Sequence, residues 1–140
     1  MAANKARERL TGIELKMPAA ATINPGDVLL FGPAAGPALA GIANDGQNLT
    51  TKPPYYSNSG YLTLDTEGAF NLSVSAVATA IAPGTLIYAH PGTTDATTGI
   101  SYGNTLNNTA ASGILVGIAE TGLASGTSGT VRVSLKDGIS

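Results

Sequence analysis

The chain of 140 residues contains no cysteine and no tryptophan, and only 5% of its residues are aromatic. Without cysteine it can form no disulfide, no thiolate metal site and no cysteine nucleophile. Charged residues make up 11% of the chain, against about 25% in an ordinary soluble domain. Hydroxyl, amide and backbone groups must therefore provide most of the polar groups at the surface. Few charges would lose their water if such a face packed against another protein.

Long apolar runs are also absent from the sequence. No stretch approaches the length that a membrane-spanning helix requires. The first residues contain no apolar run followed by a cleavage site of small residues, which a secretory signal would have. We therefore expect synthesis in a cytoplasm and no membrane partner.

Positive charge is concentrated at the N-terminus. Four of the seven basic residues lie within the first 16 positions: Lys5, Arg7, Arg9 and Lys16. Glu8 and Glu14 dilute this charge, and no aromatic residue lies there to stack on bases, so we expect no nucleic-acid partner. The alternatives are contact with an acidic protein surface and a solvated terminus without a partner. We divide the chain into a basic N-terminal arm, residues 1–16, and a β-domain, residues 17–140.

A three-part pattern occurs twice in the same order. Its parts are a Pro-Gly turn that leads into a strand, a Gly-Ile-Ala strand, and an alternating strand that begins at glycine. The copies consist of residues 23–29, 39–43 and 68–74, and of residues 81–87, 115–119 and 129–135. Duplication explains the pattern, and chance similarity between common β-sequences is the alternative. We predict an all-β domain, a compact β-barrel or jelly-roll-like sandwich, with half-repeats at about 23–75 and 81–136.

Other segments carry local signals. The apolar run 28–31 predicts a strand covered on both faces, and the alternation over residues 13–17 predicts a half-buried strand. Residues 61–65 and 70–74 also predict strands, the latter with Phe70, Leu72 and Val74 on one face. Residues 91–108 are rich in Gly, Thr and Asn and predict a long loop or a marginal hairpin, and residues 122–129 predict a flexible connector. No segment has the length and period of a core helix.

No set of residues forms a recognisable catalytic or metal-binding motif. His90 is the sole histidine, and neither a carboxylate cluster nor a nucleophile motif accompanies it, so we interpret it as structural. The string from Asp65 to Gly68 superficially resembles the Asp-Thr-Gly loop of aspartic proteases. Glu67 interrupts that pattern, and the second repeat has no matching aspartate. Phosphate-binding glycine motifs are absent. We expect no enzyme, no cofactor and no metal.

A cluster of tyrosines is the main candidate for recognition. Tyr55 and Tyr56 follow Pro53-Pro54, which matches the Pro-Pro-x-Tyr pattern of WW-domain ligands, a short pattern that often occurs by chance. Together with Tyr61 they could stack on a sugar, contact a protein, or simply cap one end of a barrel. The alternative function is therefore a carbohydrate-binding or adhesive β-module.

The repeated units and the ending at residues 129–135 resemble the small capsid cement, or head decoration, proteins of tailed phages. The resemblance covers residues 23–136 approximately. It implies a non-enzymatic virion protein, made in the cytoplasm of a bacterial host, that sits on the outer capsid surface and bridges neighbouring major capsid subunits. It also implies small oligomers, dimers or trimers, at symmetry axes of the shell.

The resemblance assigns no contact residues, so the candidates come from the arm and the tyrosine cluster. We expect Arg7 and Arg9 to pair with acidic capsid groups, and Ile13 and Leu15 to add a strand to another sheet. The capsid-contact candidates are Lys5, Arg7, Arg9, Leu10, Ile13 and Leu15. The loop-contact candidates are Tyr55, Tyr56 and Tyr61. Deletion of residues 1–12 is expected to weaken capsid binding and to leave the body folded.

Overall fold

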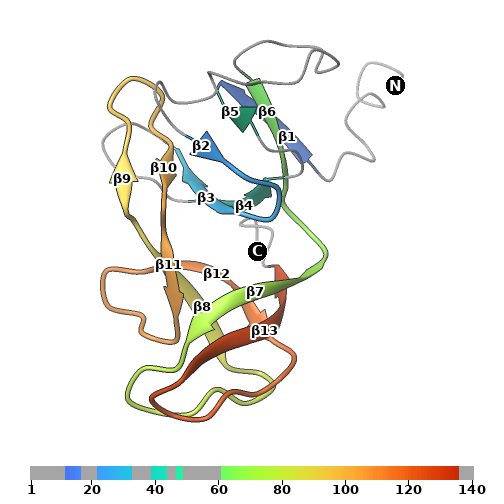
Figure 1. The fold of residues 1–140 in the computed structure, drawn as a ribbon, viewed down its shortest axis with the longest axis vertical. Coiled ribbons are helices and arrows are strands. Elements are labelled where there is room, and N and C mark those ends of the chain that lie inside the picture. Colours follow the sequence, from blue (N-terminus) through green and yellow to red (C-terminus); the bar gives the residue numbers. More distant parts are fainter. Residues whose placement is uncertain (1–11, 17–21, 33–38, 44–46, 49–60, 136–140) are drawn as a thin grey trace, which may run out of the picture.

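The computed structural model describes residues 12–16, 22–32, 39–43, 47–48 and 61–135. All regular structure within these residues is β-strand, so the predicted all-β class is confirmed. The strands form an open sheet, a closed barrel and a small two-stranded sheet (Figure 1). The small sheet pairs β2 (Thr22–Ile23) with β5 (Gln47–Asn48).

The open sheet, here called the open module, has six strands in the order β1-β6-β4-β3-β10-β9. Their bounds are β1 (Gly12–Lys16), β6 (Tyr61–Asp65), β4 (Leu39–Ala43), β3 (Val28–Phe31), β10 (Ser101–Tyr102) and β9 (Thr93–Thr94). All neighbours in it are antiparallel. All four residues of β3 are buried, which confirms the strand predicted to be covered on both faces.

The closed barrel, here called the barrel module, has five strands in the order β7-β13-β12-β8-β11, and β11 closes the ring by pairing with β7. Their bounds are β7 (Ala69–Ser75), β13 (Ser128–Leu135), β12 (Ile114–Ala119), β8 (Leu86–His90) and β11 (Thr105–Asn107). Burial alternates along β7, with Leu72 and Val74 inside and Asn71 and Ser73 exposed, as the alternating sequence predicts.

The two Pro-Gly turns have one hydrogen-bond pattern. Gly26 and Gly84 each adopt a positive φ, 93° and 98°, which the third position of the predicted turn requires. The amide of Gly26 donates to the carbonyl of Ala43, and that of Gly84 to the carbonyl of Ala119, both at 2.8 Å. The side chains of Asp27 and Thr85 accept from the amides three residues earlier, at 2.9 and 3.0 Å.

The strands that follow these turns also share one register. Val28 pairs with Ile42 in the open module, and Leu86 pairs with Ile118 at the same place in the barrel. One residue further on, Leu29 pairs with Gly41 and Ile87 with Gly117. The first two parts of the repeated sequence pattern therefore form the same structural unit twice.

The third part of the repeated sequence pattern does not correspond between the modules in the way that the sequence predicts. Ala43 pairs with Leu64 of β6, whereas Ala119 pairs with Val133 of β13. Hence β6 occupies in the open module the place that β13 occupies in the barrel. β1 takes the place of β7, because β1 pairs with β6 as β7 pairs with β13. The strand order β1-β6-β4-β3-β10 thus matches β7-β13-β12-β8-β11, and β7 and β13 are neighbours within one module.

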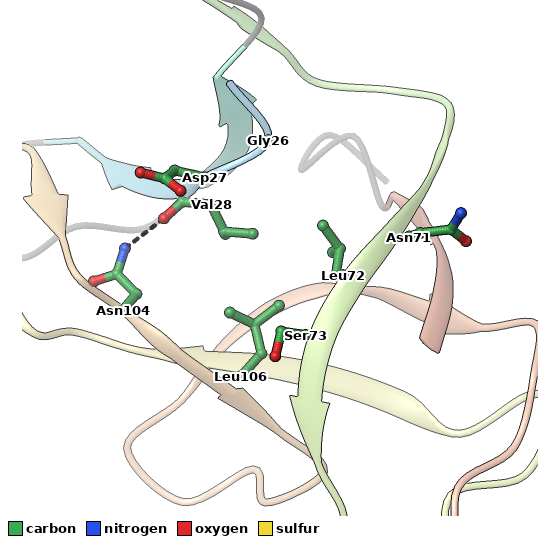
Figure 2. Close-up of a pocket in the computed structure, with 8 residues that line it drawn as sticks. All are labelled: Gly26, Asp27, Val28, Asn71, Leu72, Ser73, Asn104 and Leu106. Atoms are coloured by element: carbon green, nitrogen blue, oxygen red, sulfur yellow. Dashed lines mark hydrogen bonds between the residues drawn. The ribbon is translucent and has the colours of Figure 1, made fainter. Parts of the chain in front are cut away.

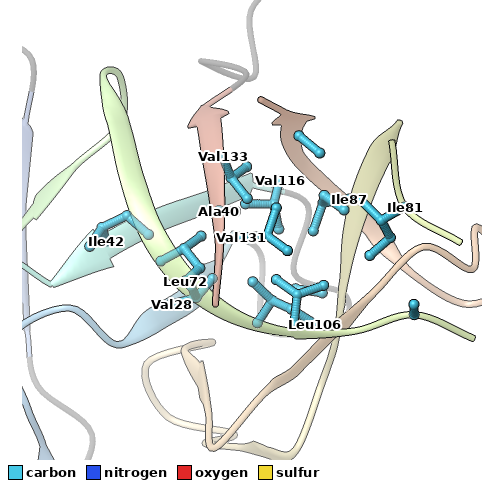
Figure 3. Packing of buried hydrophobic residues seen from close by; sticks show 14 of the residues in the cluster. Val28, Ala40, Ile42, Leu72, Ile81, Ile87, Leu106, Val116, Val131 and Val133 are labelled. Atoms are coloured by element: carbon cyan, nitrogen blue, oxygen red, sulfur yellow. The ribbon is translucent and has the colours of Figure 1, made fainter. Parts of the chain in front are cut away.

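Each module has an apolar core. The open module buries Ile23, Leu29, Phe31, Ala43, Leu64 and Ile100. The barrel buries the positions matching four of these, Ile81, Ile87, Ala119 and Val133, with Leu72, Val116 and others. The opposite face of the open module, Val28, Leu30, Ala40 and Ile42, belongs to the barrel's cluster (Figure 3). This shared cluster holds the two modules together through burial of apolar surface.

Residues 91–108, predicted to be a loop or a marginal hairpin, connect the modules. β9 and β10 form a hairpin that extends the open sheet, and β11 then closes the barrel. Ile100 is buried in the first core and Leu106 in the second. The predicted connector 122–129 is likewise bonded to the barrel, because Leu123 pairs with Ile81 and the amide of Gly126 donates to the carbonyl of Ala76.

Candidate functional site

A recess of about 180 Å³ lies where the two modules meet. Its residues come from the first Pro-Gly turn, from β7 and from the crossing between β10 and β11 (Figure 2). They are Gly26, Asp27, Val28, Asn71, Leu72, Ser73, Asn104 and Leu106. Figure 2 shows Leu72 and Leu106 directed toward the side on which Val28 lies, while the amide of Asn71 points away.

Two polar side chains of this recess, those of Asn104 and Asp27, are engaged in structural hydrogen bonds. Nδ2 of Asn104 donates to the carbonyls of Val28, at 2.8 Å, and Ser101, at 2.9 Å, and Oδ1 accepts from the amide of Gly92 at 3.0 Å. The carboxylate of Asp27 accepts from the amide within its own turn. These hydrogen bonds of Asn104 therefore fix the crossing between β10 and β11 to β3.

His90 lies at the end of β8 and is half-buried. Its Nε2 lies 2.8 Å from Oδ1 of Asn107 and 3.1 Å from the carbonyl oxygen of Thr109. Since Oδ1 of Asn107 also accepts from the amide of Thr109, both groups that face Nε2 are acceptors, and Nε2 carries the proton. His90 thus ties β8 to β11 and to the turn after it, consistent with its interpretation as structural.

Asp95 organises the hairpin between β9 and β10. Its Oδ2 accepts from the amide and from the hydroxyl of Thr98, both at 2.8 Å. The hydrogen bonds from the Thr98 amide and hydroxyl lower the pKa of this carboxyl below its ordinary value, because they favour its charged form. This turn brings Ile100 to the core of the open module.

The structure places few of the predicted contact residues. Lys5, Arg7, Arg9 and Leu10, together with Tyr55 and Tyr56, lie outside the described residues. Ile13 and Leu15, assigned to the arm and expected to add a strand to another sheet, lie in β1 and pair with Leu64 and Leu62 of the same chain. Tyr61 begins β6. Ile13 and Leu15 therefore belong to the open sheet and not to the arm. The alternating pattern of residues 13–17 predicted a strand, and that strand pairs with β6 of the same chain.

An apolar patch on the outside of the barrel was not singled out from the sequence. Leu86 and Ile118 are cross-strand partners on β8 and β12, with 43% and 41% of their surfaces exposed. Next to them, Tyr88 pairs with Leu115, and both are half-buried. We call Leu86, Tyr88, Leu115 and Ile118 the barrel patch. A sequence signal existed, since Leu86 and Ile118 match Val28 and Ile42 in the repeat.

Neither known family models, nor the curated proteins, nor the solved structures give a significant match to this chain. Within the described residues, no three His, Asp or Glu side chains gather where they could hold a metal ion. The same part of the chain contains no helix of sufficient length and hydrophobicity to cross a membrane.

Proposed function

We propose that this protein is a non-enzymatic component of a tailed-phage virion, which binds the outer capsid surface and cements neighbouring major capsid subunits. The observation that carries the proposal is the repeated unit. The first two parts of this unit, which carry part of the resemblance to head decoration proteins, form the same turn and the same strand pair in both modules. The proposal therefore rests on a unit that folds in the same way twice.

The outer face of β7 and β13 also supports a contact role. Asn71, Ser73, Ser128 and Thr130 are exposed there. These four side chains are short and uncharged, and Oγ of Ser128 lies 2.7 Å from Oγ of Ser75. The charged residue exposed on the same face of β13, Arg132, is paired with Glu120. A face of this kind loses little charge hydration when it packs on a protein shell.

The physics of a cement protein suits two modules joined by a shared core. A DNA-filled shell is pushed outward and fails when its subunits separate. A protein that binds only to correctly juxtaposed subunits adds its binding free energy to that junction. Specific interfaces bury about 1,600 Å² in total, and many copies around the shell multiply the effect.

Co-sedimentation with DNA-filled capsids from which decoration has been removed tests the proposal. We expect saturable binding at a fixed ratio to the major capsid protein and increased resistance of the capsids to heat. Folded protein that does not bind would overturn the proposal. A glycan array, with Tyr55, Tyr56 and Tyr61 replaced by Ala in a control variant, then tests the carbohydrate-binding alternative.

The arm is tested in the same assay with a shortened chain. Because Gly12 pairs with Asp65 in β1, the deletion should remove residues 1–11 and keep β1 intact. A full-length variant with Lys5, Arg7 and Arg9 changed to Ala is the matched control, because it removes charge without removing length. We expect both variants to bind capsids more weakly, and unchanged binding would exclude the arm as a contact.

A further inference from the structure

One edge of strand β7 is paired only at its end. On one side, β13 pairs with β7 from Ala69 to Ser75. On the other side, β11 pairs with β7 at a single position, where Asn107 lies beside Ser75. Before this pair the two strands lie apart, and the recess lies between them (Figure 2). We call this edge of β7, from Ala69 to Val74, the free edge.

The pairing of β7 with β13 determines where the backbone groups of β7 point. In an antiparallel pair, opposite residues alternately exchange two hydrogen bonds and none. Asn71 lies opposite Arg132, whose amide donates to Oγ1 of Thr121 and whose carbonyl accepts from the amide of Glu120. Because Arg132 thus uses both backbone groups on the far side of β13, the amide and carbonyl of Asn71 point to the free edge. Those of Ser73, two residues further on, point the same way.

These four backbone groups have no partner in the part of the chain that the structure describes, since β11 reaches β7 only at Ser75. The side chains of Asn71 and Ser73 are also exposed. Unpaired amides and carbonyls on a strand edge are a template for another extended chain. When a peptide adds to such an edge, main-chain hydrogen bonds provide affinity and pockets for alternate side chains provide specificity.

The recess beside the free edge has the size of a pocket for one side chain. Its apolar residues, Val28, Leu72 and Leu106, keep 8%, 4% and 7% of their surfaces exposed. Its volume is about 180 Å³, and apolar cavities of about 150 Å³ hold a molecule of the size of benzene. Alternate side chains of an added strand lie on the same face of the sheet as Leu72. One aliphatic side chain of that strand therefore fits the recess.

The recess also contains one charged group. Asp27 is half-buried there, and its Oδ2 accepts from the amide of Asn24. Its Oδ1 has no hydrogen bond to any residue within the described ranges, and none of the described residues that line the recess is basic. A basic side chain in an added strand would form a charge-assisted hydrogen bond with this carboxylate.

We propose that the free edge and the recess bind an extended segment of the major capsid protein, which pairs with the backbone of β7 as an added strand. The segment places an aliphatic side chain in the recess and a basic side chain against Asp27. The choice of the capsid protein rests on the function proposed above. The chemistry of the segment follows from the unpaired backbone groups, the apolar residues and the carboxylate.

Co-sedimentation of Ser73→Pro and Ser73→Ala with capsids tests this proposal. Proline removes the amide that points to the free edge and keeps the hydrogen bonds to β13, and strand edges tolerate proline. Ser73→Ala is the matched control, because it removes the hydroxyl and keeps the amide. We expect Ser73→Pro to bind at least about 10-fold more weakly and Ser73→Ala to bind like the wild type. Equal binding of wild type and Ser73→Pro would overturn the inference alone, whereas a wild type that does not bind would overturn the proposed function as well.

Hydrogen exchange of the wild-type protein remains informative if Ser73→Pro fails to fold. The amides of Asn71 and Ser73 should exchange rapidly in the free protein and at least about 10-fold more slowly on capsids. Those of Leu72 and Val74, which face β13, should exchange slowly in both states. Unchanged exchange of Asn71 and Ser73 on capsids would overturn the inference. So would protection in the free protein that disappears when residues 1–11 are deleted, because the chain's own arm would then occupy the edge.

The charge of the recess is tested with Asp27→Asn, which keeps an oxygen that accepts from the amide of Asn24. Asp95→Asn makes the same change outside the recess and is the control. At low ionic strength we expect Asp27→Asn alone to weaken capsid binding, by about 5-fold, and the difference to decrease as salt is added. Equal binding of the two variants would overturn the assignment of a basic side chain to the bound segment.

Discussion

Gly117 of β12 and Ser134 of β13 approach so closely that there is no room for a side chain between them. A Cβ atom on Gly117 would overlap the carbonyl oxygen of Ser134 and lie 2.8 Å from its carbonyl carbon. The matching residue of the open module, Gly41, is less confined, because a Cβ there would meet Cβ of Leu64 at 3.1 Å. The two glycines hold the same repeat position but differ in what lies beside them.

We therefore expect Gly117→Ala to destabilise the protein more than Gly41→Ala. The first substitution forces the backbone to move substantially and should cost about 3 kcal/mol, whereas a displacement of Leu64 by a few tenths of an ångström should keep the second below about 1.5 kcal/mol. Urea unfolding, monitored by far-UV circular dichroism, measures the loss in the free energy of unfolding for both variants. Equal losses of stability in the two variants would show that the close approach of β12 and β13 does not determine the cost at Gly117.

Asp95 gives stability a defined dependence on pH. Its pKa is lowered in the folded state, so its contribution is fully present above the pKa of a free aspartate, about 3.9. The contribution is lost as the pH falls through the lower, folded-state value. Asp95→Asn should remove this part of the pH dependence. Thr98→Val should reduce it, because one of the two donors to Oδ2 is lost.

The measurement is the free energy of unfolding from about pH 2 to 7 for the three proteins. We expect the difference between wild type and Asp95→Asn to be constant above about pH 4 and to shrink below it. A difference that stays constant over the whole range would show that the turn's hydrogen bonds do not depend on the charge of Asp95.

Asn104 fixes the start of the crossing toward β11 to the open module through its three hydrogen bonds to Val28, Ser101 and Gly92. Asn104→Ala leaves these backbone groups without their partner and should cost about 2–3 kcal/mol. Asn104→Asp should cost at least as much at neutral pH, because an oxygen then faces two carbonyl oxygens. Asn71→Ala, at an exposed position in the same recess, is the control and should change stability by less than about 0.5 kcal/mol. Thermal unfolding of the three variants and of the wild type measures these losses of stability and ranks them.

Local signals made much of the fold predictable. The Pro-Gly turns need a positive φ that glycine supplies, so their positions follow from the sequence alone. Strand β3 is a short apolar run, and its burial on both faces follows as well. Local signals do not determine which strand pairs with β4 on the side away from β3. Residues 61–65 and 68–74 both alternate between apolar and polar side chains, and only packing at long range selects the former.

The surfaces were harder to predict than the strands. The recess combines residues from three segments, with Gly26, Leu72 and Asn104 far apart in sequence. The hydrogen bond from Asn104 to the carbonyl of Val28 depends on where the Gly- and Thr-rich stretch lies in the fold, whereas the hydrogen bonds of Asp95 are confined to one turn. The barrel patch was missed because residues 86–89 are apolar at every position, so the sequence does not indicate which side faces out.

Ile42 and Ile118 test whether the matching positions of the two modules differ as their exposure indicates. Ile42 is 2% exposed in the shared core, so Ile42→Ala should cost about 2–5 kcal/mol. Ile118 is 41% exposed, and Ile118→Ala should cost less than about 1 kcal/mol in the monomer. Urea unfolding at several protein concentrations separates this cost from any effect on self-association, because only the latter depends on concentration. A loss at Ile118 as large as that at Ile42, and independent of concentration, would mean that the outer face of the barrel is already covered within one chain.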